Sequence, residues 1–268
     1  MATPAAVYSY RSKRMRRAFV GLITACLLLA TGQTRAEQAT VAVAANFTAT
    51  MAKLIALFEH ETGHQVRASF GSTGKLYAQI RHGAPYDAFM AADAERPRLL
   101  ADQGLAVAGS QIPYAEGRLV LWSRDPNLFR DGREYLNSQP QRLAIGNPKT
   151  APYGIAAIEV LENLGLAGAL SPKLVSGDSI AQTFQFIATG NARAGFVAQA
   201  QVRAYNDEEG SAWQVPKTLH KPISQHAVLL NRGHRNAAAH DWMAFLNGAK
   251  AQAIIREDGY DIPRQSTH

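Results

Sequence analysis

The stretch Thr40-Val41-Ala42-Val43-Ala44-Ala45-Asn46-Phe47-Thr48 decides the fold of this chain of 268 residues. Its first six residues are small or β-branched, and they predict a buried strand. From residue 47 to residue 62, apolar side chains recur at helical spacing, and Gly63 then ends the predicted helix. A buried strand that leads directly into an amphipathic helix is the opening unit of an α/β fold.

The same alternation of strand and helix continues along the chain. Further strands are predicted at 65–70, 87–91, 119–122, 143–146, 173–176, 194–198 and 225–230. Helices are predicted at 73–82, 94–103, 154–164, 179–189, 199–206 and 241–258. This order predicts mostly parallel sheets flanked by helices, with right-handed crossovers.

The chain contains two such βα series, and no Pro- or Gly-rich linker separates them. We therefore expect a two-lobed fold whose lobes are joined by two extended hinge strands, near 116–119 and 224–227. In this division lobe I consists of 37–117 and 226–268, and lobe II consists of 118–225. A ligand would then bind between the lobes, where strand ends meet helix starts.

Residues 1–36 have the pattern of an export signal peptide. A basic stretch at 11–17 precedes an apolar run at 18–30, and Thr34-Arg35-Ala36 supplies small residues at the −3 and −1 positions of a cleavage site. The apolar run is too short to span a bilayer comfortably. The pattern predicts export to the periplasm, with Met15 as an alternative start to Met1.

Removal of this leader changes the charge balance of the chain. The leader holds six basic residues and no acidic one, which leaves 22 Lys and Arg against 21 Asp and Glu. The basic character of the whole chain therefore gives no support for nucleic-acid binding. Cys26, the one cysteine, also lies in the leader, so the mature chain forms no disulfide. Cys26 stands in a loose lipoprotein cleavage box, and lipid anchoring is the less favoured alternative.

Four short loops place small or hydroxyl residues just ahead of predicted helix starts. They are Ala44-Ala45-Asn46-Phe47-Thr48, Gly71-Ser72-Thr73-Gly74, Ala151-Pro152-Tyr153-Gly154 and Gly177-Asp178-Ser179-Ile180, and none contains Lys or Arg. A helix N-terminus presents unsatisfied N–H groups and the positive end of the helix dipole, so it can hold an anion without a formal charge. Each loop alone suits ordinary helix capping. Two loops in each predicted lobe favour a cage of neutral donors around a small oxyanion.

A competing motif is His60-Glu61-Thr62-Gly63-His64, a literal H-E-x-x-H. In a zinc peptidase both histidines share one helix face, and the glutamate activates water. Here Gly63 stands where the helix is predicted to end, so we expect the two imidazoles to diverge. No Gly-x-Ser-x-Gly nucleophile elbow occurs elsewhere. The sequence therefore favours a binding protein without catalytic residues, and a zinc hydrolase that uses His60 and His64 is the distant alternative.

Five motifs together are typical of one known family. They are Val43-Ala44-Ala45-Asn46-Phe47, Phe70-Gly71-Ser72-Thr73-Gly74, Gly83-Ala84-Pro85-Tyr86-Asp87-Ala88-Phe89, Asn147-Pro148-Lys149-Thr150-Ala151-Pro152-Tyr153-Gly154 and Gly190-Asn191-Ala192-Arg193-Ala194-Gly195-Phe196-Val197-Ala198. With them, essentially the whole mature chain resembles the periplasmic molybdate-binding proteins of molybdate ABC importers. Each motif is only modestly specific, but five in register are strong support.

The resemblance implies a type II periplasmic-binding fold that closes over molybdate or tungstate. It implies ligand donors at Asn46 with Ala45 beside it, Thr73 with Ser72 beside it, Tyr153, and the N–H of Ile180. Ala198 stands where some members have a further tyrosine donor. The implied partners are the oxyanion and the membrane permease of the importer. The implied protein is a monomer without a cofactor, in which molybdenum is present only as the bound oxyanion. A receptor for sulfate or phosphate on the same fold is the alternative.

Overall fold

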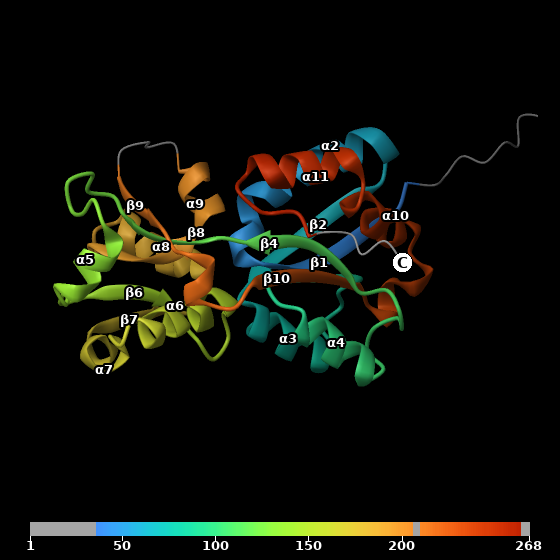
Figure 1. Ribbon diagram of the computed structural model, residues 1–268. Coiled ribbons are helices and arrows are strands. Elements are labelled where there is room, and N and C mark those ends of the chain that lie inside the picture. The colour runs from blue at the N-terminus through green and yellow to red at the C-terminus, as the bar shows by residue number, and fades with distance from the viewer. Residues whose placement is uncertain (1–35, 206–209, 264–268) are drawn as a thin grey trace, which may run out of the picture. The chain divides into compact units, whose positions relative to one another are not determined.

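The computed structural model describes residues 36–205 and 210–263 (Figure 1). The predicted leader, with Met15 and Cys26, lies outside the described residues except for Ala36. Within the described ranges, no helix is long and apolar enough to cross a membrane.

The first sheet has five strands in the order β2-β1-β3-β10-β4. They are β1 (Gln38–Ala44), β2 (Gln65–Gly71), β3 (Ala88–Ala91), β4 (Ile112–Gly117) and β10 (Ile223–Leu229). β1 runs parallel to β2 and β3, whereas β10 runs antiparallel to β3 and β4. The register places Ala44 beside Gly71, so β1 and β2 end together at one edge of the sheet.

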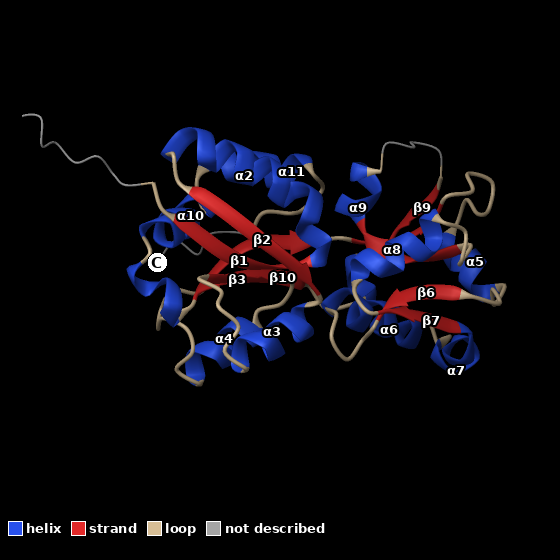
Figure 2. Ribbon diagram, turned by 180° about the vertical axis from the view of Figure 1, so that it is seen from behind, coloured by secondary structure: helices blue, strands red, loops and turns tan. Residues whose placement is uncertain are grey.

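Helices cover both faces of this sheet (Figures 1 and 2). One face carries α2 (Thr48–Thr62), α10 (Ala237–Leu246) and α11 (Ala249–Glu257), and the other carries α3 (Thr73–Arg81) and α4 (Glu95–Asp102). Alternate side chains of β1 explain this arrangement, because successive residues of a strand point to opposite faces. Val41 and Val43 pack in the cluster that contains Trp242, whereas Ala42 packs in the cluster that contains Leu76.

The second sheet has the order β7-β6-β8-β5-β9. Its strands are β5 (Leu119–Ser123), β6 (Leu143–Gly146), β7 (Leu174–Gly177), β8 (Ala194–Ala198) and β9 (Ser211–Gln214). The helices around it are α5 (Gly132–Asn137), α6 (Pro152–Asn163), α7 (Ala167–Leu170), α8 (Ile180–Ala188) and α9 (Gln199–Ala204). Leu119 and Leu121 of β5 face the cluster with α6, and Val120 and Trp122 face the cluster with α8.

Short 3-10 turns complete the described elements. They are η1 (Ala45–Phe47), η2 (Ser171–Lys173), η3 (Lys217–Leu219) and η4 (Asn231–Arg235). The two sheets with their helices form the two lobes that the sequence predicts. We call the lobe built on β1 the first lobe and the lobe built on β6 the second lobe.

Two sequence expectations need correction. The sheets are mixed rather than mostly parallel, because β5 and β10 pair antiparallel with their neighbours on both sides. Each of these strands belongs to a stretch of chain that has just passed from the other lobe, so it enters its sheet from the opposite end. The predicted terminal helix at 241–258 is two helices, α10 and α11, which are separated at Asn247 and Gly248. Glycine favours such a break because it loses the most conformational entropy inside a helix.

The chain crosses between the lobes twice. The first crossing is extended: β4 ends at Gly117, Arg118 follows, and β5 begins at Leu119. The second crossing leads from β9 through η3 to β10. The residues at 224–227, where a hinge strand is expected from the sequence, lie inside β10.

Candidate ligand site between the lobes

Two of the four sequence-predicted loops lie side by side at the edge of the first sheet. β1 leads through η1 into α2, and β2 leads through Ser72 into α3. Because Ala44 and Gly71 are partners in a parallel pair, the helix starts that follow them are neighbours. This is the edge at which ligands bind in α/β sheets, because strand ends and helix N-termini meet there.

The other two loops lie side by side in the second lobe. Gly146 of β6 pairs with Gly177 of β7, and the Asn147 N–H donates to the Gly177 carbonyl over 2.9 Å. The start of α6 packs tightly on the end of β6, because a Cβ at Gly154 would lie 2.1 Å from the Gly146 carbonyl oxygen. Only glycine allows this close approach of helix and strand.

Contacts across the lobes join the two pairs of loops. The Gly74 N–H donates to the Thr150 carbonyl over 2.8 Å. On the other side, α8 contacts η1, and Ala45 shares an apolar cluster with Ile180. Four loops therefore form a closed ring in which each loop contacts the next. We call this the four-loop ring, and its members are 44–48, 71–74, 150–154 and 177–180.

The ring holds main-chain donors that the described protein does not use. Within 36–205 and 210–263, none of the bonds outside regular elements is donated by the main-chain N–H of four residues at helix starts, Asn46, Thr73, Tyr153 and Ile180. An N–H in the first turn of a helix has no acceptor within that helix. Free N–H groups occur at any helix start. Their convergence in one ring is the unusual feature, and it places four donors and the dipoles of three helices around the same region.

Two hydroxyl groups add to these donors. In the described part of the chain, the buried Oγ of Ser72 and Oγ1 of Thr150 have no hydrogen-bond partner. Thr73 differs from Ser72, because its Oγ1 accepts a hydrogen bond from the Ala92 N–H over 3.1 Å. A buried hydroxyl without a partner is costly unless a ligand or water satisfies it. The sequence did not single out Thr150, whose contact with Gly74 depends on how the two lobes meet.

The Asn46 side chain is turned into the first lobe. Its Nδ2 donates to Gln225 Oε1 over 2.9 Å and to Tyr260 Oη over 3.2 Å. Both protons of the amide are thereby used, and Tyr260 Oη in turn donates to the Asn46 carbonyl over 2.8 Å. In this conformation the main-chain N–H of Asn46, rather than its side chain, is the donor left for a ligand.

Ala198 contributes no side-chain donor to the ring. Its N–H donates to Gln201 Oε1 over 3.1 Å, and the other end of that amide donates to the Ile180 carbonyl over 3.1 Å. Gln201 therefore links the start of α9 to the start of α8. Ala198 is fully buried and carries only a methyl group.

One ion pair links the two lobes beside the ring. Lys75 in the first lobe and Asp178 in the second lobe form an ion pair of 2.8 Å across the lobes, and both side chains are well exposed. An exposed pair of this kind contributes at most about 1 kcal/mol. The ring itself offers only neutral donors.

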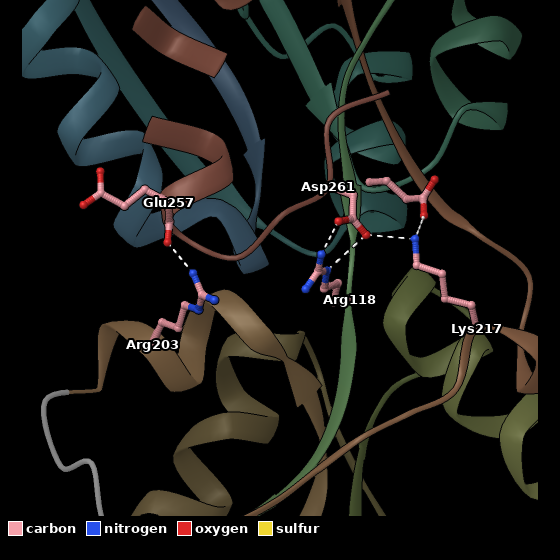
Figure 3. Close-up of polar contacts among 6 residues, drawn as sticks. Arg118, Arg203, Lys217, Glu257 and Asp261 are labelled. Carbon is pink, nitrogen blue, oxygen red and sulfur yellow. Dashed lines mark hydrogen bonds and ion pairs between the residues drawn. The ribbon is translucent and has the colours of Figure 1, made fainter. Parts of the chain in front are cut away.

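A second set of polar contacts lies beside the extended crossing (Figure 3). Asp261 forms ion pairs with Arg118 and with Lys217, and Lys217 also lies 2.8 Å from Glu116 Oε1. These partners hold the pKa of Asp261 down to about 2, chiefly through the Arg118 hydrogen bond. Arg203 of α9 donates to the Glu257 carbonyl of α11, which adds a contact between the lobes (Figure 3).

The H-E-x-x-H motif does not form a metal site. Gly63 has a φ of 73° and ends α2, so His60 lies on the helix and His64 beyond it. His64 is buried, accepts the Glu37 N–H over 3.0 Å and lies 3.2 Å from Asp241. Across the residues that the structure describes, no group of three or more His, Cys, Asp or Glu could hold a metal ion. Glycine at the helix end separates the two imidazoles, as the sequence indicates.

A model of the bacterial extracellular solute-binding proteins matches residues 39–261 of the chain, which span both lobes and the ring. The chain belongs to this family. It is accordingly a binding protein and not an enzyme.

Two similar proteins are named as molybdate-binding proteins. The chain is 49% identical to the molybdate-binding protein ModA of Rhodobacter capsulatus, over 84% of this chain and 88% of that protein. It is also 49% identical to the molybdate-binding protein ModA of Azotobacter vinelandii, over 85% of this chain and 91% of the relative.

Solved structures agree with this assignment. The periplasmic molybdate-binding protein of Azotobacter vinelandii superimposes with a TM-score of 0.81 at 40% identity, over 84% of this chain and all of that one. The sulfate-binding protein SubI of Mycobacterium tuberculosis matches with a TM-score of 0.71 at 14% identity, over 85% of this chain and 88% of that one. The second likeness shows the shared two-lobed fold alone.

Proposed function

We propose that this solute-binding protein captures molybdate, and tungstate with it, in the four-loop ring. The observation that carries the proposal is the ring itself, in which unused N–H and hydroxyl donors from both lobes meet and no loop contains a basic side chain. The relatives that are 49% identical to it over the aligned residues are named for molybdate binding, which supports the same ligand here.

A cage of neutral donors suits a small dianion. Dehydrating an unpaired dianion is very costly, so each oxygen needs hydrogen-bond donors. A hydrogen bond to a charged group contributes about 1.5–3 kcal/mol, and several of them offset this cost. Molybdate carries no proton at neutral pH and needs no acceptor from the protein. Protonated phosphate does need one, and a site made only of donors disfavours it.

We assign the donors residue by residue. Tyr153 and Ile180 contribute main-chain N–H groups from the second lobe, and Asn46, with Ala45 beside it, contributes its main-chain N–H from the first. The pair Ser72 and Thr73 contributes the unpartnered Ser72 hydroxyl and the Thr73 N–H. Their support is the hydrogen-bond pattern of the ring.

Closure of the lobes completes the site in this proposal. Both lobes supply donors, so an anion binds the full set only when the lobes meet, as in hinge closure of binding proteins. We retain the division into lobe I at 37–117 and 226–268 and lobe II at 118–225. The closed monomer then delivers the anion to the membrane permease of an ABC importer after export through the leader at 1–36.

Calorimetric titration of residues 37–268 with molybdate, tungstate, sulfate and phosphate at neutral pH tests the proposal. We expect one-to-one binding of molybdate and tungstate, with sulfate at least about a thousandfold weaker, a difference of about 4 kcal/mol. Preferential binding of sulfate or phosphate would keep the fold and replace the ligand. Binding of none of the four anions would refute the oxyanion proposal.

A further inference from the structure

A fully buried glutamine, Gln225, lies on β10 beside the place where the chain crosses between the lobes. The register of β10 against β4 shifts between Gln225 and His226, so that Gln225 pairs with Ala115 while His226 pairs with Pro113. Tyr114 of β4 lies between these two pairs and has no partner on β10. Such bulges re-aim side chains and are common near functional sites.

The Gln225 amide joins groups from both lobes. Its Oε1 accepts hydrogen bonds from Asn46 Nδ2 over 2.9 Å and from Tyr114 Oη over 3.1 Å, both in the first lobe. Its Nε2 donates to Tyr153 Oη over 3.4 Å, and Tyr153 belongs to α6 of the second lobe. One side chain therefore contacts two loops of the four-loop ring, one on each side of the ligand site.

The contact between lobes differs from those within the first lobe. At 3.4 Å it is longer than an ordinary N–H···O hydrogen bond, whereas the bonds inside the first lobe have ordinary lengths.

The crossing strand leaves room for this contact. A Cβ at Gly117 would lie 2.2 Å from Tyr153 Oη and 3.0 Å from Gln225 Nε2. The tyrosine hydroxyl thus sits directly against the backbone of the first crossing. Burial raises the pKa of Tyr153 well above its usual value, so the phenol stays neutral and can accept the amide proton.

We propose that Gln225 is a positioning residue for the bound oxyanion, which fastens the Tyr153 loop of the second lobe to the Asn46 loop of the first when the lobes close. The inference rests on the proposed function, because it assigns a role in retaining that ligand. Gln225 does not touch the anion. It fixes the position of the Asn46 main-chain N–H relative to that of Tyr153. Its loss should therefore speed ligand release and leave capture unchanged.

A double-mutant cycle tests this role. Gln225→Met keeps the volume of the side chain and removes both polar ends, and Tyr153→Phe removes only the hydroxyl and keeps the N–H donor. Tyr153→Phe should release molybdate about two- to twelvefold faster, the effect of one hydrogen bond, with an association rate close to that of the wild type. Gln225→Met also removes the bonds from Asn46 and Tyr114, so it should release molybdate at least as fast as Tyr153→Phe. The double variant should be no faster than the faster single variant, because both remove the same bond.

The chain offers a matched control pair. Tyr86 Oη donates to Gln79 Oε1 over 3.1 Å, and both residues lie in the first lobe. Gln79→Met and Tyr86→Phe make the same two substitutions at an exposed pair away from the crossing and should leave the molybdate dissociation rate unchanged.

The outcomes separate this inference from the proposed function. Additive effects of Gln225→Met and Tyr153→Phe on the dissociation rate would refute the positioning role, as would a lower melting temperature with an unchanged dissociation rate. Failure of the wild-type protein to bind molybdate would instead refute the proposed function. In that case the same two single variants and the double variant are compared by thermal unfolding without anion. Additive changes in their melting temperatures would refute the hydrogen bond between Gln225 and Tyr153.

Discussion

Gly74 is a position at which the two lobes contact each other in the ring. It lies in the first turn of α3, and its N–H donates to the Thr150 carbonyl over 2.8 Å. A Cβ at this position would lie 2.9 Å from Thr150 Cα and 3.1 Å from the Thr150 carbonyl oxygen. Both are backbone atoms of the other lobe, so Gly74→Ala should disturb the closed form and leave each lobe intact.

The expected cost can be worked from these contacts. Relieving the overlap costs about 1–3 kcal/mol, and losing the Gly74 hydrogen bond costs about 0.5–1.5 kcal/mol more. Molybdate affinity should therefore fall by about 1.5–4.5 kcal/mol, which is about tenfold to two thousandfold. Alanine is the better helix former by up to about 1 kcal/mol, so α3 itself should not be weakened. Stability and affinity are expected to change in different directions.

Calorimetry with molybdate and thermal unfolding without it measure the two effects. We expect weaker binding together with a melting temperature that is unchanged or raised by up to about 3 °C. Gly168→Ala is the matched control, because Gly168 lies in the helix α7 and an added Cβ would meet nothing within 4 Å. An unchanged affinity in Gly74→Ala would refute the argument that this contact forms in the ligand-bound protein.

Three further predictions concern the hydroxyls, the ion pairs and the histidines. Ser72→Ala should weaken molybdate binding about tenfold to 150-fold at an unchanged melting temperature. Thr73→Val should lower the melting temperature, because it leaves the buried Ala92 N–H unpaired. If the two variants change affinity and melting temperature equally, the assignment is contradicted. Asp261 has a folded pKa of about 2 against an ordinary value of about 3.9, so its ion pairs stabilise the protein above pH 4 and that contribution is lost as the pH falls from about 4 to about 2. Urea unfolding of wild type and Asp261→Asn should show a stability difference at pH 7 that shrinks across that range, and a difference that persists at pH 2 would oppose the assignment. His60→Ala and His64→Ala should both leave molybdate affinity unchanged in calorimetry. Only His64→Ala should lower the melting temperature, because it removes the contacts with Glu37 and Asp241. Loss of molybdate affinity in either variant would indicate a ligand role for the motif.

Local sequence signals located most helices and strands close to their structural bounds. The strands at 143–146 and 194–198 coincide with β6 and β8, because each is a short apolar run between turn residues. The end of α2 at Gly63 followed from the need for a left-handed residue there, and the φ of 73° confirms it. β4 and β9, which no prediction covered, carry polar or proline residues that weaken the pattern.

The hydrogen-bond partners of the candidate residues could not be predicted from neighbouring residues in the sequence. Asn46 was singled out as a donor, yet its side-chain amide bonds Gln225 and Tyr260, which are far away in the sequence. Gln225 itself stood in a predicted strand without any motif around it. The difference between the two hydroxyls likewise depends on Ala92, whose N–H donates to Thr73 Oγ1, whereas Ser72 Oγ has no partner in the described part of the chain.

The sequence alone determined the α/β class, the two lobes and the four loops, because strand and helix periodicity and helix-start chemistry are properties of neighbouring residues. The tertiary structure alone decided which donors remain free, since a hydrogen bond made elsewhere removes a group from the site. It also decided the contact of Gly74 with Thr150 and the place of Gln225 between Asn46 and Tyr153. These contacts join residues from different lobes, and no local pattern encodes how two separately packed lobes meet.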